Sequence, residues 1–134
     1  MNYFLLIFLS LNISYITISN NRFFLANKSG NNLEVDCDTS LTQIEINMCA
    51  MSEYSKADLK LNEVYQQLKT PISNTEEEKL LINAQLAWIQ FRDSNCEYAA
   101  EKYQGGSIQP FIYYSCLTRL TKERTGHLES YLTP

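Results

Sequence analysis

The sequence predicts an all-α protein, an antiparallel three-helix up-down-up bundle stapled by two disulfides. Three long segments, residues 41–69, 76–103 and 110–131, repeat apolar side chains at intervals of three and four residues, which is the period of an amphipathic helix. The turns between these segments are short, and short connections make neighbouring helices run antiparallel. No strand pattern of any length is found, so we expect no sheet.

The chain opens with an apolar run over residues 3–13. The run is too short to span a bilayer comfortably and fits the hydrophobic part of a signal peptide. We expect residues 1–26 to be a signal peptide, cleaved between Ser19 and Ala26, and the mature protein to be periplasmic or secreted, with no membrane contact after cleavage. An uncleaved membrane anchor is the alternative. No cysteine follows the run directly, which argues against a lipid anchor.

Residues 27–36 are polar and rich in residues that break regular structure, so they are predicted to be a flexible linker, followed by the helical domain at residues 37–134. Thr39 or Ser40 is expected to cap the first helix, and the residue before Pro71 should end it. The inner face of this helix is predicted from its three-four spacing as Ile44, Met48, Met51, Ser55, Leu59, Asn62 and Tyr65.

The second predicted helix begins after Thr75, a capping residue that is followed by three glutamates in the first turn, where the helix dipole favours negative charge. Gly105 and Gly106 should end it. Leu80, Trp88 and Phe91 belong to its expected inner face. The third helix should place Leu117, Leu120 and Leu128 inside the bundle.

The four cysteines, Cys37, Cys49, Cys96 and Cys116, are expected to form two bridges, because an exported protein meets an oxidising compartment. Counting residues outward from each turn shows which positions of neighbouring helices lie opposite each other, and it places positions 49, 96 and 116 at one end of the bundle. We prefer the pairs Cys37–Cys49 and Cys96–Cys116; Cys37–Cys116 with Cys49–Cys96 remains the alternative. The spacings match no pair of zinc ligands, and we expect no metal.

The same counting places Asp58 and Arg124 at one level. A carboxylate on an inner face needs a partner, and Arg124 is the expected one, with Gln85 and Asn62 as neighbours. Arg92 should lie near Tyr54. These polar side chains are interpreted as a structural clamp rather than a catalytic site; its members are Asp58, Asn62, Gln85, Arg92 and Arg124.

The sequence lacks the combinations of residues that covalent or acid–base catalysis requires. The single histidine, His127, is near the end of the last helix, no free cysteine is expected, and no Gly-x-Ser-x-Gly motif occurs. We therefore predict that the protein is not an enzyme and uses no cofactor.

The charge indicates the kind of partner. Removing residues 1–26 removes Arg22, which leaves ten basic and fifteen acidic residues and a net charge of −5. An acidic domain binds nucleic acid poorly and suits a basic protein partner; the alternative, which charge alone favours, is that the modest acidity only aids solubility. The candidate contact is the second turn with its neighbouring tyrosines, namely Gly105, Gly106, Ser107, Gln109, Tyr103 and Tyr113.

Several short motifs together resemble the N-terminal domain family of LprI-type lysozyme inhibitors over residues 37–132. They are Cys37, the Thr42-Gln43-x-Glu45-x-Asn47-x-Cys49 segment, Tyr54, Asp58, Leu61, Asn62 and Tyr65, the Gln85-x-x-Trp88-x-x-x-Arg92-Asp93-x-x-Cys96 segment, Gly105-Gly106-Ser107 with Pro110, and Cys116-Leu117-x-x-Leu120-Thr121-x-x-Arg124. The resemblance implies a small exported binding protein, with a basic lysozyme as partner and inhibition by blocking of its cleft. The alternative is an envelope structural or interaction module that binds another envelope protein and has no anti-lysozyme activity.

Overall fold

The structure is a computed structural model that describes residues 16–19, 22–26, 32–39 and 41–132. The chain divides into two compact units, residues 1–40 and residues 41–134. The apolar run at residues 3–13 lies outside the described residues, so the signal peptide remains a prediction.

The first unit contains a small antiparallel sheet that the sequence analysis did not predict. Its described strands are β1 (Ile16–Ser19), β2 (Arg22–Ala26) and β3 (Asn32–Asp36), in the order β1-β2-β3. Ile16 pairs with Leu25, and Arg22 pairs with Asp36. The expectation of no strand was wrong because these residues were assigned to a targeting segment and a linker, although β-branched and aromatic residues in β1 and β2 favour strands.

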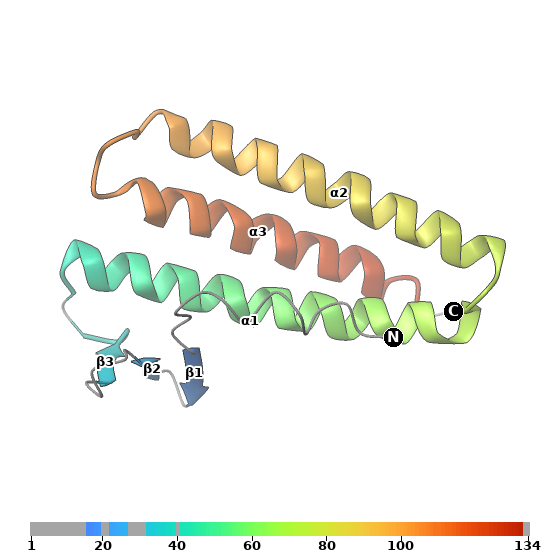
Figure 1. Cartoon of the computed structure of the whole chain (residues 1–134), viewed down its shortest axis with the longest axis horizontal. Coiled ribbons are helices and arrows are strands. Elements are labelled where there is room, and N and C mark those ends of the chain that lie inside the picture. The colour runs from blue at the N-terminus through green and yellow to red at the C-terminus, as the bar shows by residue number, and fades with distance from the viewer. Residues whose placement is uncertain (1–15, 20–21, 27–31, 40, 133–134) are drawn as a thin grey trace, which may run out of the picture. The chain divides into compact units, whose positions relative to one another are not determined.

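The second unit confirms the predicted helical bundle (Figure 1). In its described residues, α1 spans Gln43–Lys69, α2 spans Glu76–Glu101 and α3 spans Gln109–Glu129, with a short 3₁₀ turn, η2, at Thr70–Ile72. These bounds lie within two residues of the predicted ones. Pro71 lies in η2, directly after the end of α1, as expected.

The helix starts show which capping prediction was correct. Thr42, not Thr39 or Ser40, caps α1 in a reciprocal capping box with Glu45, whose carboxylate accepts hydrogen bonds from Thr42. These hydrogen bonds lower the pKa of Glu45. Thr75 caps α2 as predicted, because its hydroxyl accepts a hydrogen bond from the Glu78 amide at 3.2 Å.

Helix α3 lies between α1 and α2 (Figure 1) and packs against both. One core cluster joins Leu61 and Val64 of α1 to Leu128 of α3, with Trp88 of α2 against it. A second cluster surrounds Cys96, Leu117 and Leu120 toward the other end of the bundle. The bundle therefore has two apolar centres, one toward each end.

The inner face of α1 is rotated from the predicted one. Ile44 and Leu59 were expected inside but are 70% and 67% exposed. The buried positions Ala50, Ala57 and Leu61 follow the same three-four spacing, displaced by about one residue, which is ~100° around a helix. Met48 was predicted inside and is buried, but the small residues Ala50 and Ala57, which the prediction did not include, are buried as well. Leu80 and Phe91 of α2 were also placed inside and are exposed.

Both preferred disulfides are present. Cys96 on α2 bonds to Cys116 on α3, with their Cα atoms 5.5 Å apart. Cys37 and Cys49 are each disulfide-bonded as well, and among the described residues no cysteine is free. The second bridge is therefore Cys37–Cys49, which excludes the alternative pairing.

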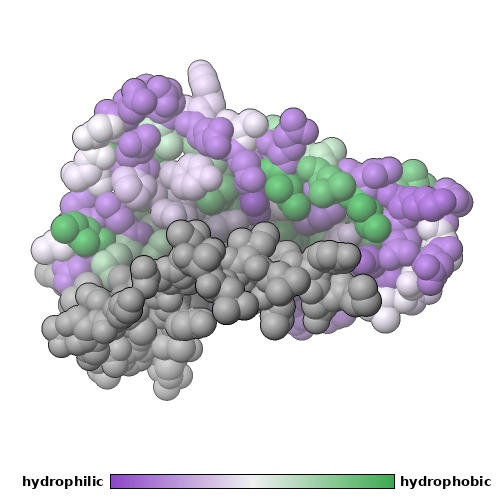
Figure 2. Space-filling model, in the orientation of Figure 1, coloured by the Kyte–Doolittle hydropathy of each residue, from purple (hydrophilic) through white to green (hydrophobic). Residues whose placement is uncertain are grey.

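The visible face of the helical unit is mainly hydrophilic, with a limited hydrophobic area near its middle (Figure 2). Exposed ion pairs lie along the helices, for example Lys60 with Glu63 and Arg119 with Glu123. Such pairs add little stability, so the fold depends on its buried clusters and bridges.

We predict that the Cys96–Cys116 bridge stabilises the bundle by constraining the unfolded chain. The bridged residues are separated by 20 positions, and replacing both with Ser should lower the free energy of unfolding by roughly 3 kcal/mol. Denaturant unfolding measures this. Dithiothreitol should lower the melting temperature of the wild type more than that of the variant. Reactive thiols in the native, oxidised protein would contradict the fully bridged structure.

Thr121 offers a second test of the core. In the described part of the chain its hydroxyl oxygen is the buried side-chain atom without a hydrogen-bond partner, and the residue is fully buried. Thr121→Val keeps the shape and removes the unsatisfied group, so we expect a gain of roughly 1 kcal/mol in unfolding free energy. Thr125→Val is the matched control, because the Thr125 hydroxyl donates to the Thr121 carbonyl. A loss at Thr121 as large as that at Thr125 would show that its hydroxyl is satisfied.

Candidate functional site

Arg92 is the centre of the polar cluster between the helices. Its guanidinium carbon lies 5.1 Å from the Trp88 ring centroid and 5.6 Å from that of Tyr54. Both rings are within the range of cation–π attraction. The Arg92 Nε also donates to the Asp93 carboxylate at 2.8 Å. The expected proximity of Arg92 to Tyr54 is thus confirmed.

The partner of Asp58 is not Arg124, as the level counting predicted, but Arg92. Arg92 Nη1 lies 3.5 Å from Asp58 Oδ1, and the Asn62 amide donates to Asp58 at 3.0 Å. The Asp58 side chain is 38% exposed, against 10% for Arg92. The prediction failed because it used the height along the bundle alone: Asp58 lies at the rim of α1, from where Arg92 of α2 reaches it.

Arg124 instead joins α3 to α2. Its Nε donates to the buried Gln85 side chain at 3.1 Å, and its guanidinium carbon is 6.0 Å from the Trp88 ring centroid. Trp88 therefore has Arg92 and Arg124 near its ring. The predicted clamp residues do lie in one region, but in two connected groups, with Asp58, Asn62 and Arg92 in one and Gln85 and Arg124 in the other.

Burial and charge act in opposite directions on Arg92. Burial opposes its charged form, yet the hydrogen bond with Asp93 and the negative charges near it outweigh that effect, so the pKa of Arg92 is raised. Burial also raises the pKa of Tyr54. Both shifts favour a charged Arg92 beside a neutral Tyr54 phenol, an arrangement that suits a structural support.

The turn between α2 and α3, residues 102–108, is ordered by its own hydrogen bonds. The Gly106 amide donates to the Tyr103 carbonyl, and the Gln109 amide donates to the Gly106 carbonyl. Gly105 has a φ of 76°, a conformation that favours glycine. A Cβ atom on Gly106 would lie 3.1 Å from the Tyr103 carbonyl oxygen, so a side chain there would be crowded.

Asn47 of α1 fixes this turn to the bundle, because its side-chain amide donates to the Ser107 carbonyl at 2.8 Å. Asn47 was not among the residues predicted to belong to this site. Tyr103 and Ser107 are exposed, as a partner-binding turn requires. Tyr113 is partly buried and stacks edge-on against Tyr114 at 5.4 Å between ring centroids, so only part of its surface is available.

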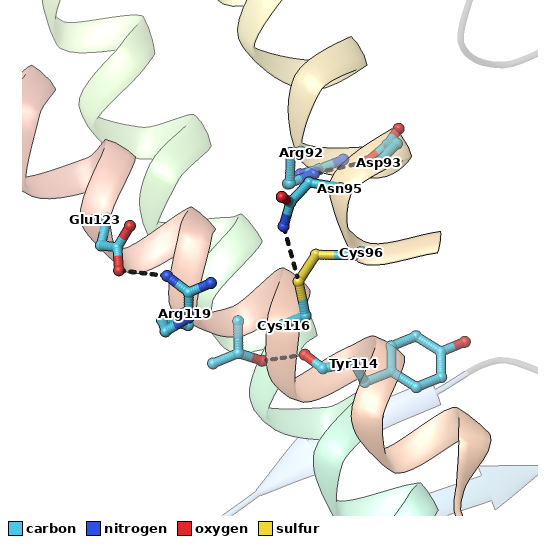
Figure 3. Close-up of a disulfide and its surroundings, with 9 residues drawn as sticks. Arg92, Asp93, Asn95, Cys96, Tyr114, Cys116, Arg119 and Glu123 are labelled. Carbon is cyan, nitrogen blue, oxygen red and sulfur yellow. Dashed lines mark hydrogen bonds and ion pairs between the residues drawn. A yellow bond between two sulfur atoms is a disulfide. The ribbon is translucent and has the colours of Figure 1, made fainter. Parts of the chain in front are cut away.

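The Cys96–Cys116 bridge lies close to this end of the helices. Figure 3 shows Asn95 and Cys96 on α2 facing Cys116 on α3, and the Asn95 amide donates to the Cys116 sulfur at 3.6 Å. Arg92 and Asp93 lie on the adjacent turn of α2 (Figure 3). The bridge thus fixes the spacing of the two helices that carry the turn.

A pocket of about 370 Å³ lies beside the turn, between the end of α2 and the start of α3. We call it the end pocket; its lining is Glu97, Ala100, Glu101, Gln109, Pro110, Tyr113 and Tyr114. Only Gln109 and Tyr113 were among the predicted contact residues. The sequence signal for the rest was weak, because two glutamates four residues apart on a helix are common.

The described residues contain no group of three metal-ligating side chains placed to hold an ion. His127 is exposed near the end of α3. None of the helices in the described part of the chain is long and apolar enough to cross a membrane.

The fold and the clusters define a small helical domain, cross-linked by disulfides, with an ordered turn and a pocket at one end. The family model of the lysozyme inhibitor LprI matches residues 36–128. The chain therefore belongs to the LprI lysozyme inhibitor family, as its motifs indicated.

Proteins from three bacteria are similar to this chain, two in sequence and one in structure. An uncharacterized protein of Rhizobium meliloti (strain 1021) is 33% identical over 74% of this chain and 80% of its own length. The uncharacterized protein YecT of Escherichia coli (strain K12) is 30% identical over 72% of this chain and 67% of its own length. A crystal structure of a DUF1311 family protein from Pseudomonas putida has a TM-score of 0.62 and 20% identity, and covers 69% of this chain and 95% of that one. The last likeness supports the helical fold.

We predict that Arg92, not Asp58, carries the stability of the cluster. Arg92→Met should lower the free energy of unfolding by about 3 kcal/mol, because it removes two ring contacts and a charge-assisted hydrogen bond. Asp58→Asn should cost less than about 1 kcal/mol, since this carboxylate is at the rim and partly hydrated. Denaturant unfolding of both variants checks the order, with Glu123→Gln as an exposed ion-pair control. A larger effect at Asp58 would contradict this assignment.

Proposed function

We propose that this protein is an exported, non-catalytic binding protein that inhibits a basic lysozyme by covering its substrate cleft. The observation that carries the proposal is the match of the lysozyme inhibitor LprI family to residues 36–128, which include nearly all of the helical unit. The remaining support comes from charge, from the ordered turn and from the disulfides.

Charge complementarity favours a basic partner. The chain has 15 acidic and 11 basic residues, and a sequence pI of about 5.0. A negative protein and a positive enzyme attract each other over distances comparable with the Debye length, roughly 8–10 Å at physiological salt. This attraction raises the association rate and orients the encounter.

The turn between α2 and α3 is the element that we assign to the enzyme's cleft. It carries exposed Tyr103 and Ile108, each 38% exposed, beside the polar Ser107. An aromatic and an aliphatic side chain next to hydrogen-bonding groups is a composition common at protein interfaces. Because Asn47 already holds the turn in place, little conformational entropy is lost when it binds.

The proposed location is the periplasm or the extracellular space. Two disulfides are stable in oxidising compartments and rare in the cytosol. A lysozyme that attacks the bacterial cell wall acts in these compartments, so the proposed location agrees with the proposed activity. Cleavage of the predicted signal peptide after Ala26 would remove β1 and β2 and leave the helical unit whole, and this mature form is the one to use in the assay.

The proposal is tested by the rate at which an animal-type lysozyme clears a suspension of bacterial cell walls. We expect the mature protein to slow clearing at micromolar concentration. Ser107→Arg with Gln109→Arg adds positive charge at the turn while retaining the Ser107 carbonyl, and should weaken inhibition about ten-fold or more.

The matched control is Gln66→Arg with Ser73→Arg, which adds the same charge at exposed positions near the other end of the bundle. It should inhibit within about two-fold of the wild type, since distant charges act mainly on encounter. Absence of inhibition by the wild type across several lysozymes would remove the proposal and leave the envelope interaction module. Equal inhibition by both double variants would remove the turn from the contact.

A further inference from the structure

The end pocket has acidic groups at its rim and aromatic groups in its walls. Glu97 and Glu101 are exposed and lie one helical turn apart on α2, so their carboxylates are on the same side of the helix. Tyr113 and Tyr114 are partly buried, and Ala100 is buried. The pocket lining thus combines aromatic rings with two negative charges on one side of α2.

These two carboxylates differ from most others in the helical unit, because among the described residues no Lys or Arg forms an ion pair with them. In the described residues, several acids along the helices pair with a Lys or Arg three or four residues away, as in Lys56–Glu53, Lys79–Glu76 and Arg119–Glu123. No such pair involves Glu97 or Glu101 within the described residues. Lys102 follows Glu101 in sequence but does not line the pocket.

The negative charges around the end pocket affect Tyr113 electrostatically. Burial raises the pKa of Tyr113, and the nearby charges of Asp93 and Glu97 raise it further. The Tyr113 and Tyr114 rings meet at 70°, so their faces point in different directions. A cation between a ring face and a carboxylate is attracted by both, and this combination occurs in sites that bind guanidinium groups.

We infer that the end pocket binds a basic side chain of the partner, an arginine in preference to a lysine. This inference rests on the proposed function and assigns it a specific anchor. A guanidinium stacks on an aromatic ring while its planar N–H groups donate to carboxylates, whereas an ammonium offers a point charge without the stacking surface. The pocket of about 370 Å³ has room for one such side chain beside the turn.

The ligand chemistry is tested directly with short peptides and the full mature protein. Acetylated triarginine amide is titrated into isotope-labelled protein, and amide shifts are followed by NMR. We expect the largest shifts at Glu97, Glu101, Tyr113 and Tyr114. Tricitrulline has nearly the same shape without the charge and should cause little change; trilysine should bind more weakly than triarginine. Equal responses to triarginine and tricitrulline, or arginine shifts centred elsewhere, overturn the inference.

Two variants that remove negative charge then test whether the pocket contributes to binding of the partner. Glu97→Gln with Glu101→Gln should weaken triarginine and lysozyme binding by about ten-fold. Glu77→Gln with Glu129→Gln is the control, since it changes the net charge equally at exposed positions near the other end of the bundle. Circular dichroism establishes that both variants fold.

The outcomes separate the two proposals. If lysozyme binds both double variants as it binds the wild type, the pocket is not the anchor, although the proposed function stands. If triarginine binds at the pocket and lysozyme is neither bound nor inhibited, the proposed function fails and the pocket remains a site for a basic side chain of another protein. If neither binds, both proposals fail.

Discussion

A buried guanidinium holds the α1–α2 side of this bundle together. Because α3 lies between the other two helices, α1 and α2 meet mainly through long side chains, and Arg92 is central among them. It contacts Trp88 and Tyr54, and is held by Asp93 and Asp58. A buried cation is costly to desolvate, and two rings with two carboxylates offset that cost. The contact fixes the distance between the helices more specifically than aliphatic packing would.

The helices themselves followed from local chemistry. Thr75, Pro71 and the Gly105-Gly106 pair mark boundaries through caps, a fixed φ and backbone freedom, and these effects do not depend on the rest of the fold. The disulfide pairing also followed, since two short turns set the height of each cysteine along the bundle. The position of a residue along the bundle axis and the ends of the helices can both be predicted by counting residues along the sequence.

The rotation of each helix about its own axis, which decides the face that is buried, could not be predicted by counting residues. On α1 the small residues Ala50 and Ala57 are buried, while the larger Ile44 and Leu59 are exposed. A large apolar residue is a poor indicator of the inner face when the interface is close. The partner of Asp58 was missed for the same reason: it depends on which helix lies beside the rim, which one-dimensional periodicity does not contain.

The candidate site was predicted in part. The turn was recognisable from its glycines and neighbouring tyrosines, and it is exposed and ordered. Asn47 and the end pocket were not recognisable, since the Asn47–Ser107 contact spans 60 positions and the pocket needs α2 and α3 to be placed together. Strands β1, β2 and β3 were missed because these residues were assigned to a targeting segment and a linker, and the weaker strand signal was not considered.

The cross-links have an uneven distribution that bears on kinetics. Cys49 and Asn47 on α1, the turn, and the Cys96–Cys116 bridge all belong to one end of the bundle, whereas the other end is held by the Leu61, Val64 and Leu128 cluster. Local opening and amide exchange should therefore begin at the end without bridges. The bridged end would then meet a partner as a nearly rigid body, and differences in affinity among its partners would arise chiefly in how long each complex lasts.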